Sequence, residues 1–181
     1  MAKLLAWFPW FASALLLAGC YAQEKSPEDL LASEEVGDAD FVRNWLQTNR
    51  HADQTAAQNF YQHGMKDFQR KAWSPAAKSF GTSMRLYPSP EALYRYVDVK
   101  LQMLAMVRKR EGDIQEKLPL DMNYALKLYR SALSANMVLG TLSEKEKTRI
   151  ENHVSCLQAY AAAGRPDMDC EPLHWYYNAA R

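Results

Sequence analysis

Two cysteines and two histidines near the C-terminus have the residue types most able to do chemistry. His153 and Cys156 are separated by two residues, and Cys170 and His174 by three. On a helix, each of these spacings places the pair on one face. Two thiolates and two imidazoles are a ligand set that structural zinc accepts. In an oxidising compartment the same two thiols form a disulfide instead, so the choice depends on where the protein resides.

Catalytic motifs of the common kinds are absent from the sequence. It has no Gly-rich phosphate loop, no nucleophile elbow and no His-Glu-x-x-His pair. Acidic and basic side chains alternate over residues 144–151, a pattern typical of a solvated helix rather than of an acid–base pair. The formal net charge is +1, so no charge excess points to nucleic acid. We therefore predict a non-enzymatic protein with no cofactor, no metal and no nucleic-acid partner.

The N-terminus has the layout of a secretory signal. Lys3 precedes an apolar run from Leu4 to Ala18. This run is shorter than the roughly 20 apolar residues that a membrane-spanning helix needs. It ends in the sequence LLAGC, whose last residue is Cys20. The ending resembles the lipobox of bacterial lipoproteins, in which a leucine and two small residues precede an acylated cysteine.

The lipobox resemblance implies that residues 1–19 are a signal peptide and that Cys20 is lipidated. Acyl chains on one residue anchor a protein durably in a membrane. In enteric lipoproteins an aspartate after the cysteine signals retention at the inner membrane, but here the residue is Tyr21. The resemblance thus implies an outer-membrane anchor with the body in the periplasm. The alternatives are an incidental cysteine after an ordinary signal, or a short anchor that is not cleaved.

The periplasm is oxidising, so we predict a disulfide between Cys156 and Cys170. A zinc site and free thiols remain the alternatives. Residues 20–39 are rich in acidic side chains and are predicted to be a solvated tether, because such a segment buries too little apolar area to order itself. The folded domain is then expected to cover residues 40–181.

The domain is predicted to be all-α, because helix-forming residues predominate and no segment alternates with the period of a strand. Ser74-Pro75 and Ser89-Pro90 each read as a cap followed by proline in the first helical turn. Ser143 and Glu146 have the spacing of a capping box. The expected helices cover about residues 41–46, 53–68, 75–86, 90–107, 121–133 and 144–163, with a short helix after Pro172.

One segment has the spacing of a helical repeat, carried by Phe60, Gly64, Ala76, Phe80, Ser83 and Pro88. It is similar to a tetratricopeptide repeat, in which small residues let two antiparallel helices approach and an aromatic fills the gap between them. A weaker second unit has an insertion between its helices, Asp98 in place of the glycine and Tyr129 on its second helix. A degenerate third unit begins near Ile150. The resemblance implies two to three tetratricopeptide-like hairpins with an extra C-terminal helix; the alternative is a generic helical bundle.

In the tetratricopeptide family, the first helices of the repeats form a concave face that receives a peptide or a helix. Methionine, tyrosine, glutamine and arginine there suit adaptable binding of a segment. The C-terminal helices could instead fill the face. Carried over to this sequence, the partner-binding positions are Gln58, Tyr61, Met65 and Gln69 in the first unit and Arg95, Val99, Gln102 and Met103 in the second.

These patterns together predict an outer-membrane-anchored periplasmic scaffold or assembly factor. Its expected partners are the membrane, through the lipid, and another envelope protein. Pilotins, which escort secretin subunits to the outer membrane, are the class it most resembles. One alternative is an envelope enzyme, or an activator of one, acting near peptidoglycan. Another is a metal-binding or redox-responsive lipoprotein that uses Cys156 and Cys170.

Overall fold

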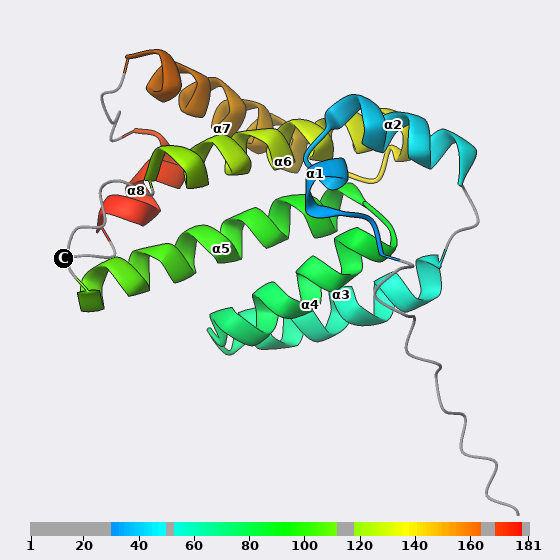
Figure 1. The fold of residues 1–181 in the computed structure, drawn as a ribbon, viewed down its shortest axis with the longest axis horizontal. Helices are drawn as coiled ribbons and strands as arrows, with labels where there is room; N and C mark the ends of the chain where they lie inside the picture. The colour runs from blue at the N-terminus through cyan, green and yellow to red at the C-terminus, as the bar shows by residue number, and fades with distance from the viewer. Residues whose placement is uncertain (1–29, 50–52, 112–117, 164–168, 179–181) are drawn as a thin grey trace, which may run out of the picture.

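The computed structural model describes residues 30–49, 53–111, 118–163 and 169–178, and these residues form helices but no strand (Figure 1). The all-α prediction is confirmed. The predicted signal peptide, Cys20 and the first part of the predicted tether lie outside the described residues. The helices are α1 (Ser33–Val36), α2 (Ala39–Thr48), α3 (Gln54–Gln69), α4 (Trp73–Leu86), α5 (Pro90–Glu111), α6 (Leu118–Leu139), α7 (Glu144–Ala163) and α8 (Glu171–Asn178).

The helices from α3 to α7 form a series in which each packs against the next. Successive members of the series run in opposite directions (Figure 1). α2 packs against α6, and α8 packs against α5 and α7. Within the described ranges, none of the helices combines the length and the apolar character that crossing a membrane requires.

Two of the predicted helix starts are confirmed by their hydrogen bonds. The backbone N–H of Ala92 donates to Ser89 Oγ over 3.3 Å at the start of α5. At the start of α7, Ser143 N–H donates to Glu146 Oε2 over 3.1 Å, and Glu146 N–H donates to Ser143 Oγ over 3.3 Å. Each cap satisfies a backbone donor that has no partner inside the helix.

Two other predicted starts are wrong. α4 begins at Trp73 with Ala72 as its N-cap, so Ser74 lies inside the first turn instead of capping it. The Trp73 ring packs against Phe68 of α3 with centroids 5.5 Å apart, and this tertiary contact supports the earlier start. α6 begins at Leu118, ahead of the predicted cap at Asp121.

The domain begins before residue 40, so the predicted boundary of the tether is wrong. Val36 is fully buried, and Leu30 and Leu31 pack against the core. Leu31 N–H donates to the Arg85 carbonyl over 3.0 Å, and Arg85 Nε donates back to the Leu31 carbonyl over 2.6 Å. The prediction relied on the acidic composition of the segment and gave too little weight to Leu30, Leu31 and Val36. These three apolar side chains pack residues 30–36 against the core beside the end of α4.

The contact between α3 and α4 is built around Gly64 and Phe80. A Cβ atom at Gly64 would lie 2.7 Å from the Phe80 ring, so the close approach of the helices requires glycine. Phe80 is fully buried, in a small cluster with Ala76, Ala77 and Val99. The Ser83 hydroxyl, which is also buried, donates to the Ala57 carbonyl over 2.8 Å. The small and aromatic residues that suggested a repeat in the sequence therefore form a contact between two helices.

Candidate functional site

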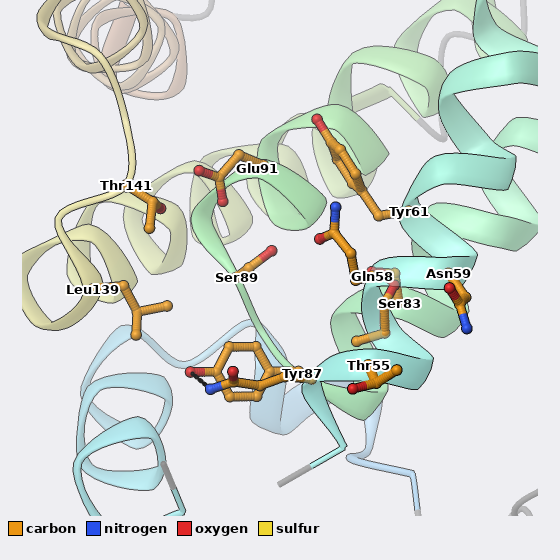
Figure 2. A pocket seen from close by; sticks show the side chains of 12 residues that line it. Thr55, Gln58, Asn59, Tyr61, Ser83, Tyr87, Ser89, Glu91, Leu139 and Thr141 are labelled. Atoms are coloured by element: carbon orange, nitrogen blue, oxygen red, sulfur yellow. Dashed lines mark hydrogen bonds between the residues drawn. The ribbon is translucent and has the colours of Figure 1, made fainter. Parts of the chain in front are cut away.

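A groove with a volume of about 630 Å³ lies beside the N-terminal half of α3 (Figure 2). We call it the α3 groove. α3 forms one wall, the end of α4 and the turn after it form the floor, and the start of α5 and the α6–α7 turn form the far side. The residues that line it are Gln54, Thr55, Ala57, Gln58, Asn59, Tyr61, Ser83, Tyr87, Ser89, Glu91, Leu139 and Thr141.

Amide and hydroxyl side chains supply most of the polar groups of the α3 groove, with Glu91 as the carboxylate among them. Gln54 Nε2 donates to the Tyr87 hydroxyl over 3.0 Å, which fixes one end of the groove. Figure 2 shows Gln58 and Tyr61 reaching from α3 toward Glu91 on α5. Such groups can accept and donate hydrogen bonds to a peptide backbone without fixing its sequence.

The predicted partner-binding positions fall into four groups. Gln58 and Tyr61 line the α3 groove. Met65, Met103 and Arg95 are half-buried along the continuation of the same face of α3 and α5, as is Gln102, while Gln69 at the end of α3 is exposed.

Val99 lies on α5 one helical turn from both Arg95 and Met103. It is fully buried in a cluster with Ala76, Ala77 and Phe80, so its side chain presents no surface to a partner.

Several residues of the groove were not predicted from the repeat pattern. Tyr87, Ser89 and Thr141 lie in turns, and Leu139 lies at a helix end, whereas the pattern assigns only inner positions of first helices. Gln54 lies one turn before Gln58 on α3, so an extended polar stripe on this helix was the available signal.

Arg95 of α5 lies between the Phe68 ring of α3 and the carboxylate of Asp98. Its guanidinium is 5.4 Å from the Phe68 ring centroid and 4.9 Å from that of Tyr94, so both rings hold it by cation–π contact. Arg95 Nη1 is 3.9 Å from Asp98 Oδ2. Burial raises the pKa of the Tyr61 hydroxyl, and the nearby Arg95 opposes this rise.

Asp98 is a buried carboxylate at the junction of α5, α6 and α7. Its Oδ1 accepts a hydrogen bond from the Tyr129 hydroxyl over 2.8 Å, and its Oδ2 is 3.4 Å from Arg149 Nη2. Burial raises the pKa of Asp98 to about 6, although Arg149, Tyr129 and Arg95 all favour the charged form. In the predicted repeat alignment, Asp98 takes the place of Gly64 and Tyr129 takes the place of Phe80. The structure shows the carboxylate and the hydroxyl of these two residues hydrogen-bonded to each other.

α8 is attached to this junction through Glu171. Arg149 donates to Glu171 from Nε over 3.1 Å and from Nη2 over 3.3 Å. His153 Nε2 lies 2.8 Å from Glu171 Oε2. The His153 ring packs edge-on against Tyr129 and Trp175. Burial lowers the pKa of His153, and Glu171 opposes that effect.

The predicted disulfide between Cys156 and Cys170 is present, with an S–S distance of 2.04 Å. The two sulfurs are bonded to each other and are not thiolate ligands, while His153 is engaged by Glu171. His174 is exposed, and its backbone N–H donates to the Cys170 carbonyl. The four residues of the zinc alternative therefore do not form a zinc site here. Elsewhere in the described part of the chain, no cluster of His, Cys, Asp and Glu suits a metal ion.

Replacing both Cys156 and Cys170 with serine is expected to lower the free energy of unfolding by about 3 kcal/mol, because the bridge restricts a short loop in the unfolded chain. Urea unfolding followed by circular dichroism measures the difference. The wild-type protein in reducing buffer is the matched control and should unfold at the same urea concentration as the double variant. Equal midpoints for the oxidised wild type and the double variant would contradict the prediction.

No family model, curated protein or solved structure matches this chain. The fold therefore defines the class of protein as an all-helical domain of sequentially packed hairpins, and its function has to be argued from the geometry of its surfaces.

Proposed function

We propose that this protein is a lipid-anchored adaptor at the bacterial outer membrane, and that the α3 groove binds a segment of another envelope protein. The observation that carries the proposal is the continuous face formed by α3 and α5. It begins at the groove with Gln58 and Tyr61 and continues through the half-buried side chains Met65, Arg95 and Met103. Methionine and tyrosine adapt to different partners at low cost in conformational entropy, which suits the binding of a protein segment.

The titratable groups of the domain favour binding over catalysis. Asp98 and His153 have shifted pKa values, as catalytic groups often do. Both are paired with other protein side chains inside the junction of α5 to α8, away from the α3 groove. The groove itself presents amides and hydroxyls, and these suit recognition of a polypeptide.

The location rests on the N-terminus and on the disulfide. The ending LLAGC has the residue types of a lipobox, and the pair Cys156–Cys170 is bonded as in proteins of oxidising compartments. A tether between Cys20 and residue 30 would leave the domain close to the membrane surface. The tetratricopeptide-like pairing of α3 and α4 around Gly64 and Phe80 supports an assembly role similar to that of pilotins.

Site-specific photocrosslinking in living cells tests the proposal. A photoreactive residue at Gln58 or Tyr61 is expected to crosslink one dominant envelope protein. The matched control is His63, which is exposed on the opposite side of α3. Equal crosslinking from His63 and Tyr61, or none from the groove positions, would contradict a binding role for the α3 groove.

The same cells test the anchor. Cys20→Ser removes the lipidated thiol and is expected to move the protein from the outer-membrane fraction to a soluble fraction or to leave it uncleaved. Radiolabelled palmitate should label the wild type and not the variant. Labelling of the variant, or unchanged cleavage and fractionation, would show that Cys20 is not the anchor.

A further inference from the structure

α8 is a helix of the chain itself that packs on α5, one of the two helices that form the face proposed to bind a partner. It packs against α5 and α7, and Leu173 at its centre is fully buried. In Figure 1, α8 lies toward the C-terminal end of α5, while the start of α3 lies near the other end. α8 therefore lies along the later part of α5, while the α3 groove borders the start of this helix.

Two arginines, Arg149 of α7 and Arg95 of α5, lie near the same carboxylate oxygen of Asp98. Arg149 Nη2 is 3.4 Å and Arg95 Nη1 is 3.9 Å from Asp98 Oδ2. Arg149 also pairs with Glu171 of α8 through two nitrogens, and its guanidinium lies 5.3 Å from the Trp175 ring. One helix thus supplies Arg149 with both a carboxylate and an aromatic ring.

Arg95 has the aromatic contacts and a hydrogen bond with the Tyr61 hydroxyl, but among the described residues no second carboxylate pairs with it as Glu171 pairs with Arg149. Phe68 and Tyr94 hold its guanidinium in place, so little conformational entropy is left to lose on binding. Its Nε is buried and has no hydrogen-bond partner among the described residues. The Arg95 side chain as a whole is 22% exposed, so a carboxylate of a partner can reach the part of it that faces solvent. Asp98 is already engaged by Tyr129 and Arg149, so it does not fill this role.

We infer that the segment bound beside α3 is an amphipathic helix whose carboxylate pairs with Arg95, in the way that Glu171 of α8 pairs with Arg149. This inference rests on the proposed function. The half-buried side chains Tyr61 and Met65 next to Arg95 receive the apolar side chains of that helix, as the core receives Leu173. A bidentate arginine–carboxylate pair sets the register of the helix.

Glu91 adds a second requirement. It lies one helical turn before Arg95 on α5 and borders the α3 groove. A second acidic side chain of the partner would be repelled there, and a basic one would be attracted. The bound helix therefore carries an acidic and a basic residue one turn apart, and this polarity decides in which direction it lies along α5.

The test combines photocrosslinking from Tyr61 with changes at Arg95, and mass spectrometry identifies the crosslinked peptide. Arg95→Met is expected to reduce the crosslink yield about tenfold or more, the size of effect that follows from losing a desolvated charge pair. Arg95→Lys should retain an intermediate yield. The matched control is Lys100→Met, which removes a charge from a different face of α5 and should leave the yield unchanged.

Arg95→Glu should abolish the crosslink, and a lysine in place of the acidic residue of the crosslinked helix should restore it. Restoration also shows that the variant folds, and thermal unfolding of each purified variant provides an independent check. A wild-type crosslink that survives both Arg95→Met and Arg95→Glu would overturn the Arg95 inference while leaving the proposed binding role intact. No wild-type crosslink from Gln58 or Tyr61 would overturn both.

Discussion

Replacing Arg149 with methionine is expected to lower the free energy of unfolding by about 3–5 kcal/mol at pH 8, because it leaves the buried carboxylate of Asp98 without its nearest cation. Asp98 has a side chain that is 5% exposed, so water cannot take over the role of the guanidinium. The variant also loses the two hydrogen bonds from Arg149 to Glu171, which hold α8. Urea unfolding followed by circular dichroism measures the effect.

The loss should depend on pH in a defined direction. The pKa of Asp98 is raised to about 6 in the folded wild type, above its ordinary value near 3.8, so the folded state binds this proton more tightly than the unfolded state. Arg149 lowers this pKa, and without it the pKa of Asp98 rises further. The destabilisation that comes from Asp98 is therefore full only above this further raised pKa, shrinks as the pH falls from there toward 6, and is lost below about 6, where the carboxyl is neutral in both folded proteins.

Two variants separate the charge from the packing. Arg149→Lys keeps a cation near Asp98 and should recover part of the stability. Combining Asp98→Asn with Arg149→Met removes both charges and should be more stable than Arg149→Met alone at pH 8. A loss for Arg149→Met that is independent of pH, and is not relieved in the double variant, would mean that Asp98 is not the group left uncompensated.

Phe80→Ala is expected to destabilise the domain by about 3–5 kcal/mol, the usual range for removing a fully buried aromatic side chain. The ring fills the space between α3 and α4 directly opposite Gly64, and neither helix can collapse onto the cavity without disturbing Val99 of α5. Differential scanning calorimetry together with urea unfolding measures the change.

Gly64→Ala tests the same contact from the other side. Its Cβ would lie 2.7 Å from the Phe80 ring, and such overpacking is typically unfavourable by about 1–3 kcal/mol. In the background of Phe80→Ala the added methyl group has room, so Gly64→Ala should be neutral or stabilising there. Additive effects of the two substitutions would contradict the direct contact and, with it, the repeat-like packing of α3 on α4.

The contact between α5 and α6 shows why the predicted second unit was hard to interpret from sequence. Asp98 stands where the repeat pattern has glycine, so the sequence indicated only a weak match to the pattern. In the structure its carboxylate accepts a hydrogen bond from Tyr129, the residue that corresponds to Phe80. A buried polar contact thus joins α5 and α6, where an apolar contact joins α3 and α4, and Arg149 from α7 compensates its charge.

Local backbone chemistry determined the all-α fold and the starts of α5 and α7, because these depend on residues close together in sequence, whose geometry a helix fixes by its own period. The contact of Gly64 with Phe80 joins two helices, and only the resemblance to a helical repeat indicated it from the sequence. The disulfide was also predictable, because only Cys156 and Cys170 were left to pair once Cys20 was assigned to the lipid. The lipid anchor and the adaptor role remain predictions from the sequence.

Tertiary packing alone decided the burial of Val99, the docking of residues 30–36 and the composition of the α3 groove. It also decided that Arg149 and Glu171 reach the junction at Asp98, leaving Arg95 with an unpartnered donor. These contacts join residues that are distant in sequence and lie on separate helices. Their geometry depends on how close the helices approach and how they are rotated about their axes, and no local spacing in the chain specifies either quantity.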